Sequence, residues 1–304
     1  MDKRLQLLTG KKQKLDTFRP LPPELVKNLD EWFKVELTYT SNAIEGNTLT
    51  RAETALVVEK GLTVQGKSLT EHLEATNHAE ALDYVKTLIS QKRQDITEND
   101  ILDIHRLILN KIEADNAGRY RTQHARLTES DVVLPNPVKI PDLMQEFMRW
   151  LVSVNSDHIV KIAADAHYKL VSIHPFSDGN GRTSRLLMNL ILMQEGYPPA
   201  IIRKEDRLAY INSLEKAQKG GGLDDFYNLI YGAVDGSLNI YLEALEPESQ
   251  RFYTTDEVAK LLQVDPESVR RWVRKGNLRA AKLGGKFIRI DKADLDRFIE
   301  QLKT

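Results

Sequence analysis

The stretch His174-Pro-Phe-Ser-Asp-Gly-Asn-Gly-Arg-Thr-Ser-Arg185 brings together an imidazole, a carboxylate, two glycines and two guanidinium groups. Residues 159 to 173, which precede it, place apolar side chains at helical spacing. Residues 182 to 195, which overlap its end, are apolar on nearly every side. The stretch is therefore predicted to join two helices, the second of which lies in the middle of a helical bundle.

The residue types in this stretch are those that bind and move a phosphate-containing group. Its glycines allow unusual backbone angles, and the unpaired amides at the start of the next helix can point at one anion. Arg182 and Arg185 are three residues apart on the first turn, so both can reach that anion. Asp178 supplies a hard oxygen of the kind that Mg²⁺ takes beside phosphates. His174 is the group that can accept a proton near neutral pH.

Taken singly, each of these residues has a simpler interpretation. His174 would end a helix, Asp178 would cap one, the glycines would form a turn and the arginines would face solvent. The combination favours the phosphate site. The pattern is neither a Walker-type phosphate loop nor a dinucleotide-binding Gly-x-Gly-x-x-Gly.

At each of its fixed positions the stretch resembles the signature of Fic proteins, His-x-Phe-x-Asp/Glu-Gly-Asn-Gly-Arg-x-x-Arg. Ser41-Asn-Ala-Ile-Glu-Gly-Asn47 resembles the inhibitory motif, Ser/Thr-x-x-x-Glu-Gly/Asn, of Fic proteins whose inhibitory helix precedes the core. Gly118-Arg-Tyr-Arg121 and the residues up to Pro137 resemble the entry to the family's β-hairpin flap. The resemblance covers residues 20 to 230 and implies a mainly α fold with one small hairpin.

Fic enzymes generally transfer AMP from ATP to a Ser, Thr or Tyr hydroxyl of a protein, which can be the enzyme itself. The resemblance implies that His174 is the catalytic base, that Asp178 holds Mg²⁺ and that Arg182 and Arg185 bind the β- and γ-phosphates. The nucleotide-binding residues that it implies are Asp178, Gly179, Asn180, Gly181, Arg182, Thr183, Ser184, Arg185 and Tyr210, with Ala125, Arg126, Leu127 and Thr128 of the flap.

Glu45 ends an apolar, helix-forming stretch. The resemblance implies that it pairs with Arg185 and so keeps the γ-phosphate from its partner; taken alone, it would be an exposed residue at a helix end. In some relatives the same glutamate assists removal of AMP, so a reverse reaction stays open.

Other assignments have close alternatives. The flap could be a plain surface hairpin, and Tyr210 could be a core residue. Gln218 stands where relatives have asparagine, which affects the choice of base. Phe176 and His167 are expected to be structural.

The C-terminal residues predict a second kind of module. A helix with a Thr cap is expected over 254 to 262, a second helix over 266 to 275, a hairpin over 278 to 290 and a closing helix over 291 to 302. This order resembles the winged helix-turn-helix of the excisionase and MerR type.

The charge distribution agrees with a separate module. Residues 251 to 304 carry a net charge of +5, which leaves −6 for the rest of the chain. Arg270, Arg271, Arg274 and Lys275 are the candidates for DNA contacts. A solvated basic face explains the same count, and winged helices also serve in docking or dimerisation.

We expect four regions: a helical region with the inhibitory motif at 1–105, a Fic core at 106–232, a linker at 233–250 and the winged helix-turn-helix at 251–304. The chain of 304 residues contains no cysteine, which excludes disulfides and fits a reducing compartment. Its start has no apolar signal-peptide core, and no apolar run approaches a membrane span. A cytoplasmic homodimer without a membrane partner is expected.

The leading hypothesis is a Mg²⁺-dependent protein adenylyltransferase that Glu45 inhibits. One rival is a DNA-binding regulator whose Fic domain senses a nucleotide. A second rival keeps the fold and transfers another group, such as UMP, phosphate or phosphocholine.

Overall fold

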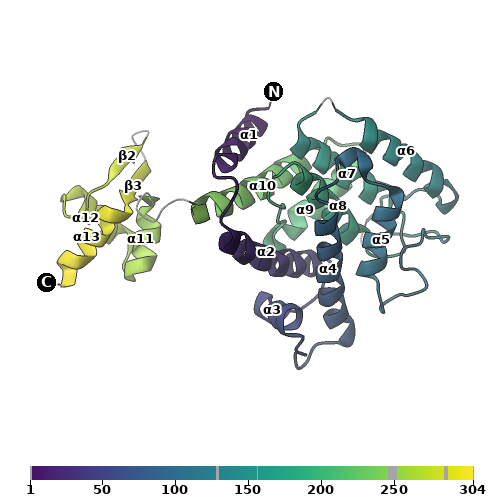
Figure 1. Cartoon of the computed structure of the whole chain (residues 1–304), viewed down its shortest axis with the longest axis horizontal. Helices are drawn as coiled ribbons and strands as arrows, with labels where there is room; N and C mark the ends of the chain where they lie inside the picture. Colours follow the sequence, from purple (N-terminus) through teal and green to yellow (C-terminus); the bar gives the residue numbers. More distant parts are fainter. Residues whose placement is uncertain (1, 128–129, 156, 246–251, 284–286, 304) are drawn as a thin grey trace. The chain divides into compact units, whose positions relative to one another are not determined.

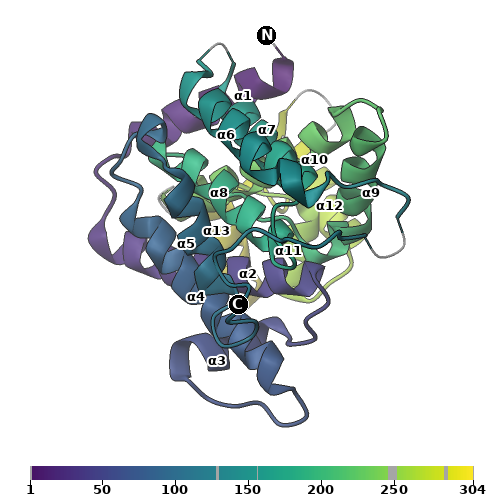
Figure 2. The same ribbon diagram turned by 90° about the vertical axis from the view of Figure 1, so that its right-hand side faces the viewer.

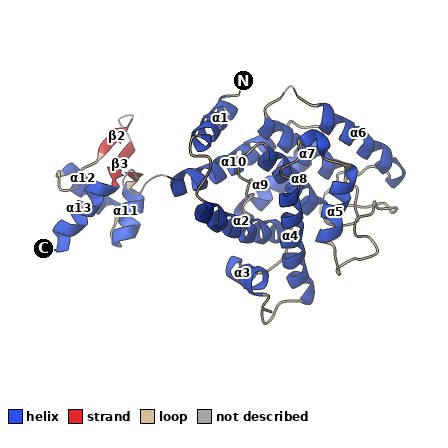
Figure 3. Ribbon diagram, in the orientation of Figure 1, coloured by secondary structure: helices blue, strands red, loops and turns tan. Residues whose placement is uncertain are grey.

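The computed structural model describes residues 2–127, 130–155, 157–245, 252–283 and 287–303. The chain divides between Tyr241 and Leu242 into two compact units, which are described separately below. Helices dominate the described residues, and the strands among them belong to the second unit (Figure 3). Within the described residues, every helix is too short or too polar to cross a lipid bilayer.

The first unit is a bundle of α-helices with short 3₁₀ turns between some of them (Figure 1). Its helices are α1 (Lys3–Asp16), α2 (Pro23–Ile44), α3 (Arg51–Lys60), α4 (Leu69–Thr87), α5 (Glu98–Ile108), α6 (Ile140–Ser153), α7 (Ile159–Ile173), α8 (Asn180–Gln194), α9 (Arg207–Gln218) and α10 (Asp224–Leu245). The 3₁₀ turns are η1 (Arg93–Asp95), η2 (Pro137–Lys139) and η3 (Lys204–Asp206).

Helix α8 forms the centre of this bundle. Its residues are almost all buried, including the apolar run from Leu186 to Leu192. Helices α7, α5, α4 and α2 pack around it, and the two ribbon views show it in the interior (Figures 1 and 2). The helix predicted from its all-round apolar character is therefore confirmed as the core element. Its first turn carries the signature residues.

Helix α2 brings the segment from Ser41 to Asn47 to the first turn of α8. It begins with Pro23 in the first turn, where a missing amide proton costs nothing. Its C-terminal part, Thr38 to Ile44 apart from the half-buried Tyr39, is buried against α4 and α8. The helix ends at Glu45, and Gly46 follows with a φ of 101°, a backbone angle that glycine adopts without strain. The turn that follows therefore reverses the chain at the edge of the site.

The flap differs from the expected β-hairpin. The described residues between 119 and 136 form no strand. Arg121 ties the two ends of the segment instead: its side chain donates to the carbonyl oxygens of Gln123 (3.0 Å), Pro135 (2.7 Å) and His174 (2.8 Å). Since two strands on their own are marginally stable, side-chain bonds can hold such a segment where a ladder does not form.

The two units divide inside the predicted linker, but the expected interruption of the helix there was wrong. Helix α10 continues through 233–245, and Gly236 and Ser237, which we expected to interrupt it, lie inside it. Val234, Leu238 and Leu242 bury one face of this part. A glycine in a helix costs about 1 kcal/mol, whereas burying one such side chain contributes about 1.5–3 kcal/mol. Residues 246 to 251 lie outside the described residues.

The second unit is a winged helix-turn-helix, as predicted. It contains β1 (Phe252–Tyr253), α11 (Thr255–Leu262), α12 (Pro266–Arg274), β2 (Ala281–Leu283), β3 (Phe287–Asp291) and α13 (Lys292–Lys303). The antiparallel strands lie in the order β1-β3-β2, and β1 is an addition to the predicted hairpin. Its own core is formed by Val258, Ala259, Val269, Leu278, Ile290, Leu295 and Phe298.

Candidate active site

The signature forms a tight corner between α7 and α8. His174 ends α7 in the left-handed region, with φ of 51° and ψ of 58°, and Gly179 caps α8 with φ of 73°. Inside the corner, the side chain of Asn180 accepts from the amide of Phe176 (3.0 Å) and donates to its carbonyl (2.9 Å). The predicted helix-loop-helix is confirmed, and Asn180 is the residue that closes its loop.

His105 of α5 packs against this corner and stabilises it, a role that the sequence analysis did not predict. Its ring stacks on the fully buried Phe176 at 3.6 Å. Its Nδ1 accepts from the amide of Gly118 (3.0 Å), so Nε2 carries the proton and donates to the carbonyl of Asp178 (3.0 Å). Burial lowers the pKa of His105 to about 4, which keeps the ring neutral. In the sequence, its position beside Ile104 on the buried face of α5 is the feature that could have indicated this role.

His174 is neutral at physiological pH and lines a cavity beside the corner. Burial is the largest cause that lowers its pKa, to about 4, and the nearby Arg121 acts in the same direction. Its Nδ1 faces the carbonyl of Val171 at 3.4 Å. Because this nitrogen meets an acceptor, it carries the ring proton, and Nε2 is the atom that can take up another.

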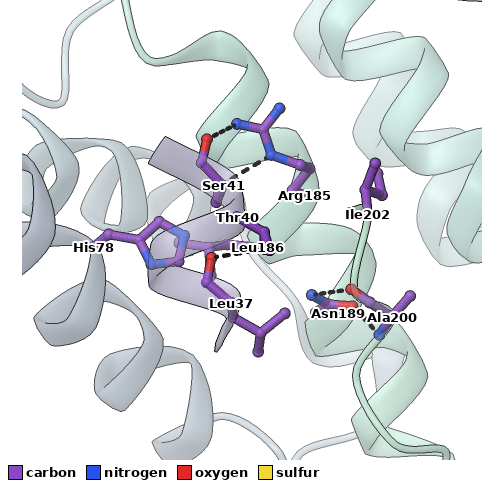
Figure 4. A pocket seen from close by; sticks show the side chains of 9 residues that line it. All are labelled: Leu37, Thr40, Ser41, His78, Arg185, Leu186, Asn189, Ala200 and Ile202. Carbon is purple, nitrogen blue, oxygen red and sulfur yellow. Dashed lines mark hydrogen bonds between the residues drawn. The ribbon is translucent and has the colours of Figure 1, made fainter. Parts of the chain in front are cut away.

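Arg185 is buried and bound by the end of helix α2. Its Nε donates to Ser41 Oγ (3.0 Å), and its Nη2 donates to the carbonyl of Ser41 (2.9 Å) and to Glu45 Oε1 (2.6 Å). Figure 4 shows the bonds between Ser41 and Arg185, with His78 of α4 on the far side of the small hollow behind them. Burial alone would lower the pKa of Arg185, but the charge of Glu45 and the hydroxyl of Tyr210 raise it.

The carboxylate of Glu45 lies directly against the first turn of α8. A Cβ atom built on Gly181 would stand 2.3 Å from Glu45 Oε1 and 3.0 Å from Arg185 Nη1. The helix bonds of α8 begin when the amide of Thr183 meets the carbonyl of Gly179 (2.9 Å), so the preceding amides are those of an open helix N-terminus. The carboxylate of Glu45 therefore lies beside this helix end and against Arg185.

Arg182 lies between two carboxylates. It is 2% exposed, and its Nη1 donates to Glu74 Oε1 and its Nη2 to Asp178 Oδ2, both at 2.9 Å. The Asp178 side chain is 54% exposed. Among the described residues, no group of three or more histidine and acidic side chains gathers to hold a metal. One accessible carboxylate fits a Mg²⁺ ion that takes its remaining ligands from phosphates and water.

A cavity of about 360 Å³ opens beside these groups. Glu45, His174, Gly181 and Arg185 line it, together with apolar and polar side chains of α9 and the flap: Leu127, Ser130, Leu208, Tyr210, Ile211, Asn212, Leu214, Glu215 and Gln218. Of the predicted flap residues, Leu127 lines the cavity, Ala125 and Arg126 do not, and Thr128 lies outside the described residues. Ser130 Oγ donates to Glu215 Oε1 (2.9 Å), which ties the flap to α9.

Several predicted nucleotide-binding side chains have structural roles in this chain. Thr183 and Ser184 are fully buried in α8, and Thr183 Oγ1 donates to the carbonyl of Gly179 (2.9 Å). Asn180 holds the loop as described above. Tyr210 lines the cavity, yet its hydroxyl accepts from Arg185 Nη1 (3.3 Å) and donates to Nε2 of the buried His167 (2.8 Å). The side chains of Asn180 and Thr183 thus have partners within the corner, and nucleotide contacts by Asn180, Thr183 and Ser184 stay a prediction.

A helical bundle whose central helix starts at such a corner, beside a cavity, defines the class of protein to which the chain is compared. The model of the Fic/DOC family matches residues 95–192, and that of a helix-turn-helix domain matches residues 252–303. A solved structure of Fic-1 (residues 134–508) from C. elegans is 32% identical with a TM-score of 0.73, and the match covers 80% of this chain and 72% of that one. The chain belongs to the Fic family.

Two further relatives extend this comparison. A Fic domain-containing signaling protein from Bacteroides thetaiotaomicron is 30% identical with a TM-score of 0.71, over 79% of this chain and 97% of that chain. A protein from Nematostella vectensis named protein adenylyltransferase Fic is 44% identical over 206 residues, which are 67% of this chain and 48% of the relative. The chain thus spans about half the length of the curated relatives it matches.

Proposed function

We propose that this protein transfers AMP from ATP to a Ser, Thr or Tyr hydroxyl of a protein, and that Glu45 holds the reaction off. The observation that carries the proposal is the seat of the Glu45 carboxylate, 2.6 Å from Arg185 and against Gly181, beside a neutral His174. A site that holds a carboxylate on an arginine, beside a helix N-terminus, is equally suited to a phosphate. The names of the curated relatives support the choice of AMP as the transferred group.

The roles follow from where the side chains lie. His174 Nε2 takes the proton of the attacking hydroxyl as its oxygen forms the bond to the α-phosphorus. The bond from that phosphorus to the β-phosphate oxygen breaks, and pyrophosphate leaves. The amides at the start of α8 stabilise the charge on the α-phosphate, and Arg182 and Arg185 bind the other two phosphates. Asp178 would hold Mg²⁺, which supplies positive charge to the phosphate oxygens when bound.

Autoinhibition follows from competition for Arg185. The buried guanidinium has one carboxylate partner and three neutral acceptors, and ATP must replace that carboxylate to place its γ-phosphate there. Charge-assisted hydrogen bonds of this kind contribute about 1.5–3 kcal/mol. Loss of the glutamate therefore corresponds to a gain of at least tenfold in productive ATP binding.

The test compares the wild-type chain, Glu45→Gly, Glu45→Gly/His174→Ala and Glu31→Gly, incubated with Mg²⁺, α-labelled ATP and cell lysate. We expect label on the enzyme and its targets to rise at least tenfold in Glu45→Gly. We expect the added His174→Ala to lower the rate by about 10²-fold or more, because the base is lost. Glu31→Gly removes an exposed carboxylate of the same helix and serves as the control.

Two outcomes would redirect the proposal. Equal label in wild type and Glu45→Gly contradicts autoinhibition. Tight ATP binding without transfer from ATP, UTP or a choline-containing nucleotide would favour a nucleotide sensor. Competition among these nucleotides also tests whether the amide of Gln218, which lines the cavity, selects adenine.

We further propose that the protein acts as a homodimer in the cytoplasm, and that the same site removes AMP from the modified target.

DNA binding is a second candidate function, which we propose for residues 252–303. Arg270, Arg271, Arg274 and Lys275 are all exposed on or just after α12, the second helix of the turn. Arg270 and Arg274 also pair with Glu267, and such exposed pairs are weak enough for phosphates to replace. A basic second helix is the element that enters the major groove in this class of module.

A gel-shift assay with fragments of the source genome tests this second function. We expect Arg271→Ala and Lys275→Ala each to weaken binding and to lower the salt dependence by about one ion. Lys260→Ala, which changes an exposed lysine of α11, is the matched control. Binding that is unchanged in both α12 variants would favour a docking role for the module.

A further inference from the structure

Glu74 of α4 connects the signature helix to the turn that follows Glu45. Its Oε1 accepts from Arg182 Nη1 (2.9 Å), and its Oε2 accepts from the side-chain amide of Asn47 (2.8 Å). Arg182 is 2% exposed and Glu74 is 18% exposed at the side chain, so solvent screens this contact weakly. One carboxylate therefore connects an arginine of the signature to the turn that follows Glu45.

Asn47 is the residue that fixes this turn. Besides its bond to Glu74, its Nδ2 donates to the carbonyl of Glu71 (3.1 Å), and its Oδ1 accepts from the amide of Leu49 (2.9 Å). Its own amide donates to the carbonyl of Asn42 in α2 (3.0 Å). Glu45 lies two residues earlier, so the place of its carboxylate depends on how Asn47 holds the chain.

We propose that Glu74 is a positioning residue that couples nucleotide binding at Arg182 to the release of Glu45 from Arg185. When Arg182 moves toward the phosphates of a nucleotide, its bond to Glu74 is lost. Glu74 is also the carboxylate that binds Asn47. The hold on the turn weakens, and Glu45 leaves Arg185 at lower cost. The coupling is reciprocal, because a loosened turn also frees Arg182. This inference rests on the proposed function and adds to it the route by which inhibition is relieved.

Asn47→Asp tests the coupling without changing either arginine, and it also removes the bond to the carbonyl of Glu71. The new side chain has the same size and keeps the oxygen that meets the amide of Leu49. It replaces the amide donor by a carboxylate oxygen that faces Glu74 Oε2, and two like charges at that distance repel. We expect AMP transfer and ATP affinity to rise about tenfold, the effect of losing one charge-assisted bond.

Comparing Asn47→Asp in the wild-type chain and in Glu45→Gly shows whether Asn47 acts through Glu45. In Glu45→Gly, the added Asn47→Asp should change transfer and ATP affinity much less than it does in the wild-type chain, since the carboxylate it releases is absent. Asn239→Asp is the matched control: its amide donates to Asp235 within α10 (3.3 Å), outside the cavity. Glu74→Gln in the Glu45→Gly background should lower the KM for ATP more than it changes kcat, because Arg182 is then held less firmly and moves to the phosphates at lower cost.

Calorimetric titration with ATP separates failure of this inference from failure of the proposed function. Tighter ATP binding in both Glu45→Gly and Asn47→Asp supports the coupling even if no protein is labelled. Tighter binding in Glu45→Gly alone overturns it and leaves autoinhibition intact. A melting curve checks that Asn47→Asp folds. If Asn47→Asp does not fold, Asn47→Ser takes its place in the titration. Its hydroxyl reaches the amide of Leu49 but not Glu74.

Discussion

The pKa of a single histidine sets the pH range over which the proposed reaction runs. Burial, and to a lesser extent Arg121, lower the pKa of His174 from 6.5 to about 4. A general base must be unprotonated, so it works above its pKa and fails below it. For Glu45→Gly we expect a rate that stays level from about pH 8 to about pH 6 and falls as the pH approaches 4.

Initial rates at saturating ATP, with circular dichroism at each pH to confirm that the fold persists, measure this profile. Half of the rate lost near pH 6.5 would mean that His174 titrates as an exposed histidine. It would also mean that the buried, neutral ring described here is not the form that acts. Glu45→Gly/His174→Ala gives the background rate at every pH.

Residues that belong to one continuous motif were predictable, and residues whose roles arise from packing were not. The pair of Glu45 and Arg185 could be inferred because each belongs to a short recognisable pattern, and the structure brings them to 2.6 Å. Glu74 and His105 lie on other helices, at spacings typical of any amphipathic helix. Their partners come from chain segments that are far away in sequence, so no local pattern marks them.

At the scale of elements, burial outweighed local signals. The two signature helices were predicted within two residues of their ends, because a long apolar period is a strong signal. Gly236 and Ser237 suggested a break, but a buried face keeps α10 continuous through them. The flap was expected as paired strands. A strand needs a partner strand that its own residues do not specify. Here the side chain of Arg121 fixes the flap instead, by its bonds to the carbonyls of His174 and Pro135.

At the scale of the whole molecule, the division into two units predicts that their functions can be separated. Each unit has buried side chains of its own, and the division falls between Tyr241 and Leu242. A chain shortened to end at Leu245, where α10 ends, should keep the ATP affinity and the label transfer of its parent. It should lose the gel shift, because α12 is gone.

Label transfer and calorimetry on the shortened wild type and the shortened Glu45→Gly measure this separation. A shortened wild type that labels as strongly as Glu45→Gly would mean that residues beyond 245 contribute to inhibition. A shortened chain that no longer melts cooperatively would mean that the first unit depends on the second for its stability.

Gly181 has a consequence for how this protein can change over generations. The space above its Cα serves the carboxylate of the resting chain and, in the proposed reaction, the phosphate that replaces it. A side chain at this position would push the carboxylate away, since the carboxylate is the end of a flexible side chain. Loss of restraint can therefore arise on either wall, by substitution of Gly181 or by changes in the segment from Ser41 to Asn47. A population under selection for activity would draw its escape variants from both places.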